Sequence, residues 1–309
     1  MSHSSPLKRQ LLRALPGGVF LLSAGLKLFD TAAFELYLFS FGFFSFDLSS
    51  LLARLLIGIE LLLGLGLLLG WRERLTASSA LTLLLLFSGW LLWRISLGDE
   101  ENCHCMGTLL PFTPEESLLK NLALIPPLLY LLLRPRQALW QPSKGWRFSI
   151  GVALLLLPLI ISPPNAILRL GKSSTKIEQE PLQELLSEEG IQLGSGRRAL
   201  LFLSTECTHC QRMIHKIGST LRRHRLESKL LYALFLATSE EMNEPVEAFF
   251  RTGGIEIERW SAPHPRLLLK ACQGALPLIL FLEEGVVVAQ YDYLTLTEEA
   301  LCEFLAPQR

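Results

Sequence analysis

Long apolar segments, separated by short charged loops, dominate the first half of the chain. Each approaches the roughly 20 residues that an α-helix needs to cross a bilayer core of about 30 Å. The last two are shorter and contain prolines, which membrane helices tolerate when their neighbours satisfy the freed carbonyls. The pattern predicts five transmembrane helices: Leu11–Phe29, Leu48–Gly70, Leu75–Leu97, Leu118–Leu133 and Trp146–Ile161.

The second half has the pattern of a globular domain. It follows Pro163–Thr175, a stretch of proline, glycine, serine and lysine that is typical of a linker. Short apolar runs then alternate with helical patterns, and Glu283–Gly285 is a hairpin signal between two of the runs. The predicted strands are Ala199–Ser204, Leu230–Ala237, Leu278–Leu282 and Val286–Tyr291, and the predicted helices are Cys207–Arg225, Ser239–Arg251 and Thr297–Leu305.

These elements divide the chain into three parts. Residues 1–140 form a four-helix membrane bundle, residues 141–175 a fifth, tethering helix with the linker, and residues 176–309 an α/β domain. The first segment has a basic start, but its apolar stretch continues past Ser23–Gly25 to Phe29. We therefore expect it to be a retained helix and not a cleaved signal peptide.

The charges of the loops predict the orientation in the membrane. Basic residues cluster before the first helix, between the second and third, and between the fourth and fifth, whereas the alternate loops are acidic or nearly neutral. Because cytoplasmic loops carry the excess of lysine and arginine, the N-terminus is expected in the cytoplasm. Five crossings then place the α/β domain on the extracytoplasmic, periplasmic side of the inner membrane.

Composition narrows the classes of function. Half of the 309 residues are hydrophobic, only 19% are charged, and the charges sum to zero. We therefore expect much of the chain to lie in the lipid bilayer. It lacks the basic surface that nucleic-acid binding requires, so no nucleic-acid partner is expected.

Cys207 and Cys210 form a C-x-x-C pair that follows a buried strand and opens a helix. A helix N-terminus offers unpaired amides and the positive end of the dipole, which stabilise a thiolate. The thiolate is the attacking species in disulfide exchange. We therefore expect Cys207 to attack, Cys210 to resolve the mixed disulfide, and His209 to help stabilise the thiolate.

Residues 178–305 resemble the thioredoxin superfamily. The resemblance rests on the strand–CxxC–helix unit and on Pro277, which precedes the hairpin where that family places a cis-proline beside the dithiol. It implies a thioredoxin-like α/β fold. Histidine before the second cysteine is similar to the oxidase and isomerase branches, whereas Glu206 replaces a frequent tryptophan and its charge opposes thiolate formation. The direction of electron flow therefore stays open.

Two other interpretations of Cys207 and Cys210 are a structural disulfide and half of a zinc site. A structural zinc site needs four ligands, and neither a second CxxC nor a suitably spaced histidine pair follows. We expect redox activity, no metal and no cofactor.

A second cysteine pair, Cys103 and Cys105, lies just past the third predicted helix, on the same side of the membrane as the α/β domain. Two cysteines one residue apart can form a disulfide only with a bent backbone, so such a bond is strained and easily exchanged. We expect this pair to be the redox partner of the CxxC pair. The alternatives are a structural disulfide that closes the loop without exchanging, and a soft-metal site that includes His104.

Residues 11–133 resemble the MauE family of methylamine utilisation and the related DoxX-like membrane proteins. The resemblance is carried by the pattern Gly-x-Phe-x-x-Ser-x-x-x-Lys that ends at Lys27, by Glu60 with Gly64, by Cys-x-Cys-x-Gly that ends at Gly107, and by Lys120-Asn121. It implies a four-helix bundle and a role in supplying disulfides to exported proteins. Fusions of vitamin K epoxide reductase-like bundles to thioredoxin domains are similar in architecture, but their helix-embedded CxxC is missing here, so quinone reduction does not carry over.

Glu60 falls near the middle of the second predicted helix. A carboxyl group there is costly, so it is either a functional group or a protonated residue that joins helices. Lys27 and Arg54 lie nearer helix ends and are expected to snorkel to the interface.

Together these patterns predict a membrane-anchored thiol–disulfide oxidoreductase that acts on exported, cysteine-containing proteins. Its client and its electron donor or acceptor are left open. Two alternatives are a non-enzymatic membrane scaffold for maturation of an exported protein and a membrane protein that handles soft metals through its cysteine pairs.

Overall fold

The computed structural model describes residues 6–96, 106–107, 109–110, 112–134, 143–164, 167, 179–188, 190–191, 196–236, 243–262 and 265–306. Cys103, His104 and Cys105 lie outside these residues, as does most of the linker Pro163–Thr175. The chain divides into two compact units. One comprises Met1–Leu38 and Leu48–Pro164, and the other comprises Phe39–Asp47 and Asn165–Arg309.

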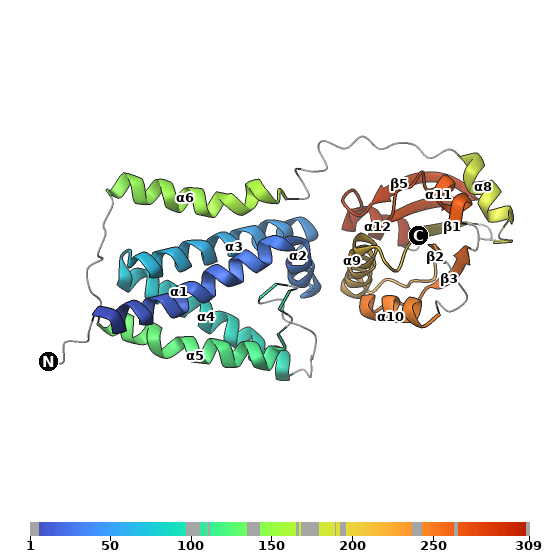
Figure 1. Cartoon of the computed structure of the whole chain (residues 1–309). Coiled ribbons are helices and arrows are strands. Elements are labelled where there is room, and N and C mark those ends of the chain that lie inside the picture. Colours follow the sequence, from blue (N-terminus) through green and yellow to red (C-terminus); the bar gives the residue numbers. More distant parts are fainter. Residues whose placement is uncertain are drawn as a thin grey trace. The chain divides into compact units, whose positions relative to one another are not determined.

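The first unit is helical (Figure 1). Its helices are α1 (Pro6–Phe29), α2 (Thr31–Ser40), α3 (Phe46–Leu69), α4 (Glu73–Ser96), α5 (Pro114–Leu133) and α6 (Lys144–Ile161). By length and composition, four can cross a membrane, over Lys8–Phe29, Phe46–Leu69, Glu73–Ser96 and Pro114–Leu133. These four confirm the first four predicted helices, with small shifts of their ends.

Two features of the helical unit differ from the sequence prediction or fall short of it. Helix α2 was not predicted, because Asp30, Glu35 and Asp47 gave the segment the composition of a loop. Glu35 is fully buried in the structure. Helix α6 has 18 residues, or about 27 Å at 1.5 Å per residue. Since it is shorter than the other four, the fifth crossing stays a prediction.

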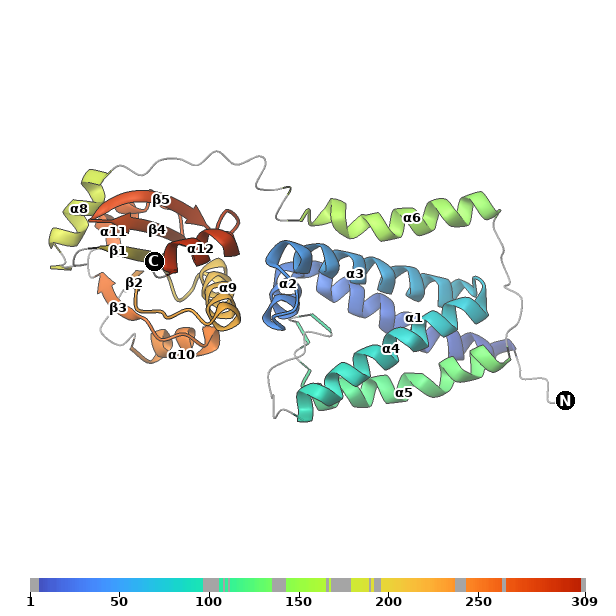
Figure 2. The same ribbon diagram turned by 180° about the vertical axis from the view of Figure 1, so that it is seen from behind.

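Helices α1, α3, α4 and α5 run alongside one another (Figure 2). Their apolar side chains form one core, which includes Phe20, Leu67, Leu84 and Leu128. A Cβ atom added at Gly64 of α3 would lie 3.0 Å from the carbonyl oxygen of Gly17 in α1. Glycine therefore lets these two helices cross closely.

Buried ion pairs join the helices at their ends. Glu73, in the first turn of α4, accepts hydrogen bonds from Arg9 Nη2 at 2.6 Å and from Arg13 Nε at 3.0 Å. Both arginines belong to α1, and Arg9 also donates to the carbonyl oxygen of Arg134 at the end of α5. This cluster ties three helices together at one end of the bundle.

The predicted snorkelling of Lys27 and Arg54 is wrong. Lys27 is buried and its Nζ lies 2.5 Å from Oε1 of Glu60. Arg54 is buried as well, lies 2.8 Å from Glu35 Oε2, and donates from Nε to the carbonyl oxygen of Ser162 at 2.7 Å. Each cation finds a carboxylate inside the bundle, so its charge does not have to reach water.

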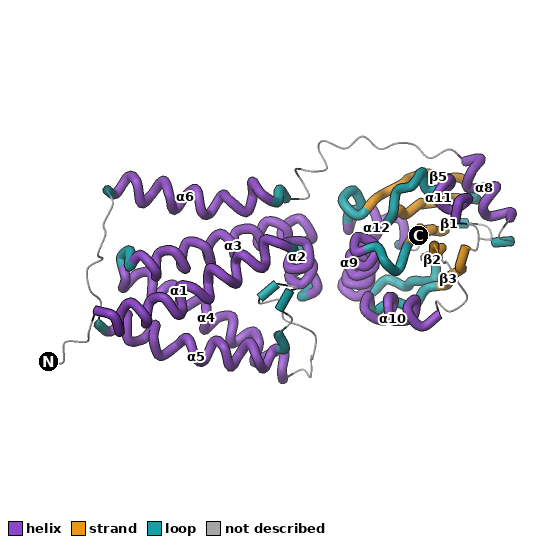
Figure 3. Tube along the Cα trace, viewed as in Figure 1, coloured by secondary structure: helices purple, strands orange, loops and turns teal. Residues whose placement is uncertain are grey.

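The second unit is an α/β domain built on a five-stranded mixed sheet (Figure 3). The strand order is β3-β2-β1-β4-β5, with β1, β2 and β3 parallel and both β4 and β5 antiparallel to their neighbours. Its elements are α8 (Gln179–Glu188), β1 (Arg197–Leu203), α9 (Thr208–His224), β2 (Leu231–Leu236), α10 (Asn243–Gly253), β3 (Glu258–Ala262), α11 (Pro265–Ala271), β4 (Leu278–Glu283), β5 (Val286–Asp292) and α12 (Glu298–Leu305).

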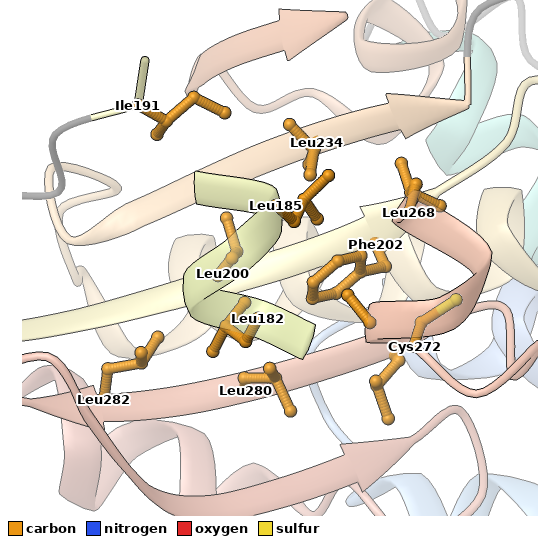
Figure 4. Packing of buried hydrophobic residues seen from close by; sticks show 12 residues of the cluster. Leu182, Leu185, Ile191, Leu200, Phe202, Leu234, Leu268, Cys272, Leu280 and Leu282 are labelled. Atoms are coloured by element: carbon orange, nitrogen blue, oxygen red, sulfur yellow. The ribbon is translucent and has the colours of Figure 1, made fainter. Parts of the chain in front are cut away.

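Helices cover both faces of the sheet, so the central strand β1 is buried on both sides and reads as a continuous apolar run. On one face, Leu182 and Leu185 of α8 and Leu268 of α11 pack with Leu200 and Phe202 of β1 (Figure 4). The opposite face meets α10 and α12 through aromatic pairs, Phe235 with Phe250 and Phe281 with Phe304.

The predicted hairpin is confirmed. Glu284 and Gly285 have φ values of 51° and 77° between β4 and β5, as expected of a two-residue turn with two left-handed positions. The predictions missed α8, β3 and α11. Strand β3 reads Glu-Arg-Trp-Ser-Ala and lies at the edge of the sheet, so it lacks the apolar run by which a buried strand is recognised.

Replacement of Glu73 by glutamine is expected to destabilise the bundle by about 3 kcal/mol or more, because it leaves two buried arginines without a counter-charge. Thermal unfolding of the detergent-purified protein, followed by circular dichroism, measures the effect. Glu115→Gln, in the exposed first turn of α5, is the matched control and should change stability by no more than about 0.5 kcal/mol. Equal unfolding temperatures for the two variants would contradict this role of Glu73.

Candidate functional site

The end of β1 and the start of α9 place Cys207 and Cys210. Strand β1 ends at Leu203, and the chain turns so that the amide of Cys207 donates to the carbonyl oxygen of Ser204 at 3.2 Å. Helix α9 begins at Thr208 with Cys207 as its N-cap. The predicted strand–CxxC–helix unit is therefore present.

Cys207 caps the helix with its sulfur. It has an extended backbone, with φ −86° and ψ 110°, and its Sγ accepts the backbone N–H of Cys210 at 3.3 Å. The carbonyl oxygen of Cys207 accepts from the amides of Cys210 and Gln211 at 3.0 and 3.2 Å. The sulfur thus lies where free amides and the helix dipole favour a negative charge.

The two thiols have unequal surroundings. Cys207 is half-buried, whereas Cys210 is completely buried. Burial raises the pKa of the Cys210 thiol far above its usual value, and a side-chain hydrogen bond with Cys207 raises it further. Cys210 therefore keeps its proton at neutral pH, and Cys207 is the sulfur that a partner can reach.

Pro277 lies beside the pair. The Leu276–Pro277 peptide bond is cis, and the carbonyl oxygen of Leu276 lies 3.9 Å from Cys207 Sγ. The structure thus brings together Cys207, Cys210 and the segment of Pro277, which are about 70 residues apart in sequence. The contact between the Leu276 carbonyl oxygen and Cys207 was not predicted, because the position of a backbone group leaves no signal in the sequence.

His209 is exposed, and its ring lies 6.0 Å from that of Tyr293 in the segment after β5. Lys216 of α9 holds the same segment, because its Nζ donates to the carbonyl oxygens of Tyr293 at 3.1 Å and Leu296 at 2.6 Å. Neither Tyr293 nor Lys216 was predicted. An isolated lysine in an amphipathic helix gives no indication that it is directed inward.

Two further cysteines are free thiols, Cys272 buried after α11 and Cys302 half-buried in α12. Burial raises the pKa of both thiols. Among the residues that the structure describes, no group of three or more histidine, cysteine, aspartate or glutamate side chains is arranged to hold a metal ion.

The membrane pair itself, Cys103 and Cys105, lies outside the described residues. Gly107, which follows it, has φ 71°, and a Cβ atom there would lie 2.7 Å from the carbonyl oxygen of Leu26. Only glycine fits this contact with α1. Glu60, the intramembrane candidate, pairs with Lys27, and its Oε2 accepts from Ser23 Oγ at 3.1 Å.

Comparison with known proteins gives one family match and one relative. Residues 8–134 match the family model of the methylamine utilisation protein MauE. This match and the four apolar helices make the chain a multi-pass membrane protein. It is 33% identical to the protein TlpB of Flavobacterium psychrophilum, in an alignment that covers 79% of this chain and 80% of that protein. The chain therefore belongs to the same family as TlpB, with a membrane part of the MauE type.

Proposed function

We propose that the chain is a membrane-anchored thiol–disulfide oxidoreductase whose α/β unit is a thioredoxin-like domain. The observation that carries the proposal is the unequal pair at the start of α9, with one reachable sulfur at the N-cap and one buried thiol that stays protonated. A structural disulfide has no need of this inequality, whereas disulfide exchange depends on it.

The architecture around the pair supports a thioredoxin-like domain. The mixed sheet with order β3-β2-β1-β4-β5 carries the dithiol at the end of its central strand. Helices cover both of its faces, and the carbonyl oxygen of Leu276, which precedes the cis-proline Pro277, lies 3.9 Å from Cys207 Sγ. The strand–CxxC–helix unit and the proline segment are the two features on which the resemblance to the thioredoxin superfamily rests.

The chemistry follows from the two environments. In the oxidising direction, a client thiolate attacks Cys207 of the Cys207–Cys210 disulfide, and the Cys210 sulfur leaves with the electron pair and takes up a proton. A second client thiolate then attacks the mixed disulfide, forms the client disulfide and releases Cys207 as the thiolate that the helix amides stabilise. In the reducing direction the same steps run in reverse. The Leu276 carbonyl and Pro277 position the client chain, and His209 supports the thiolate.

The membrane part would serve as the partner of this domain. Cys103 and Cys105 would exchange with Cys207 and Cys210, and the basic loops would keep both pairs on the periplasmic side, where exported proteins acquire disulfides. The clients are then exported proteins that contain cysteine.

Cys207→Ser is expected to reduce exchange activity to the uncatalysed background, because the attacking sulfur is lost. Cys210→Ser should instead accumulate mixed disulfides between Cys207 and disulfide-bonded exported proteins, because the thiol that resolves them in the reducing direction is lost. Non-reducing electrophoresis of acid-quenched cells, followed by mass spectrometry, detects these adducts. Cys302→Ser is the matched control and should behave as the wild type. Client maturation that survives Cys207→Ser would favour the scaffold function over the redox function.

In the reduced protein at pH 7.5, iodoacetamide is expected to label Cys207 at least about tenfold faster than Cys210, because the raised pKa of Cys210 removes its thiolate. Peptide-resolved mass spectrometry gives the two rates. In urea the rates should converge, since both thiols then have ordinary pKa values near 8.5. Equal rates in the folded protein would refute the assigned order of attack.

Replacing Cys103 and Cys105 by serine is expected to shift the resting redox state of Cys207 and Cys210 in cells. Acid-quenched thiol trapping measures that state. A shift toward the dithiol would mean that the membrane pair oxidises the soluble pair, and a shift toward the disulfide would mean that it reduces it. An unchanged state would break the proposed link between the two pairs.

A further inference from the structure

A largely apolar cavity with a few charged groups lies inside the helical unit. It has a volume of about 60 Å³, and its lining comes from helices α1 to α5. One water molecule needs roughly 10–15 Å³ on this measure, so the cavity has room for a small group with several heavy atoms. Most of its wall is apolar, including Val19, Phe20, Leu84 and Phe87, and three of its lining residues are charged.

The charged residues are Lys27, Glu60 and Lys120. Lys27 and Glu60 neutralise each other at 2.5 Å, and the Lys27 ammonium also lies 4.8 Å from the centre of the Phe34 ring. Lys120, in α5, is half-buried and lies within electrostatic range of both. Two ammonium groups and one carboxylate leave the described lining with a formal charge of +1.

Lys120 is the group without a counter-charge. Within the described part of the chain, no carboxylate and no hydrogen-bond acceptor pairs with its ammonium, and its neighbour Asn121 donates instead to Ser88 Oγ at 3.2 Å. In the helical unit, the buried cations Arg9, Arg13, Lys27 and Arg54 each meet a carboxylate. A charged group in an apolar cavity is costly unless it is paired.

We propose that this cavity binds a small amphipathic carboxylate, such as a fatty acid, whose head group pairs with Lys120. A single negative charge balances the lining, and the apolar wall accepts the first methylene groups of the hydrocarbon chain. An inorganic anion would leave the apolar wall of the cavity in contact with water. A neutral ring compound would leave the Lys120 ammonium without a negative partner. The site does not involve the cysteines, so it stands or falls independently of thiol exchange.

The test uses the full chain purified in detergent, with decanoate as the probe and methyl decanoate as its uncharged counterpart. Binding is measured by native mass spectrometry and by the rise of the unfolding temperature. Decanoate is expected to bind one per chain and at least about tenfold more tightly than the ester, because removing one partner of a buried charge pair is costly. Equal binding of acid and ester, or a preference for a neutral benzoquinone, would overturn the proposal.

Variants locate the site. Lys120→Gln should bind decanoate as weakly as the ester, whereas Arg74→Gln, which changes an exposed cation before the apolar part of α4, should bind it as the wild type does. Val19→Phe fills the cavity and should abolish binding of both molecules, which distinguishes a cavity from partition into the micelle. Retention of the acid preference in Lys120→Gln would overturn the assignment.

Asp99, Glu100 and Glu101, which follow α4, lie outside the described residues. Neutralising all three should leave decanoate affinity unchanged. A tenfold or greater gain in affinity would show that one of them is the partner of Lys120, and would overturn the proposal of a bound carboxylate.

Discussion

A buried charge is costly unless it is paired, and the helical unit is organised around this constraint. Arg9 and Arg13 meet Glu73, Arg54 meets Glu35, and Lys27 meets Glu60. Each pair joins two helices, so the same contacts that neutralise charge also fix which helices are neighbours. The same constraint underlies the proposal for Lys120. Its ammonium has no ion-pair partner among the described residues, so we assign its counter-charge to a bound carboxylate.

The α/β unit holds two sulfurs one helical turn apart in different surroundings. The central strand β1 is buried up to its last residue, and helix α9 begins shortly after it. The buried strand therefore fixes the position of the two cysteines. The first cysteine is left at the open end of the helix and the second is turned into the core. The reactivity of the pair thus follows from where a strand ends and a helix begins, with no additional charged residue required.

Local patterns were sufficient for a large part of the structure and of the site. Apolar length predicted the four long helices, and the glycine turn predicted the hairpin of β4 and β5. The spacing and position of Cys207 and Cys210 predicted their place at a helix start. The predictions failed where a distant partner decides. Glu35 made α2 look like a loop because Arg54 cannot be foreseen from local sequence, and Lys27 seemed free to snorkel because Glu60 lies 33 residues away.

The burial of Cys210 has a further consequence, which concerns damage by oxidants. Thiolates attack peroxides, so the accessible Cys207 is the sulfur that can become a sulfenic acid, and further oxidation of that group to a sulfinic acid is irreversible for most proteins. A protonated thiol one turn away condenses with the sulfenic acid, releases water and forms the disulfide, a form that belongs to the ordinary cycle. The buried cysteine therefore also protects its partner, because it converts an oxidative lesion into a normal state of the protein.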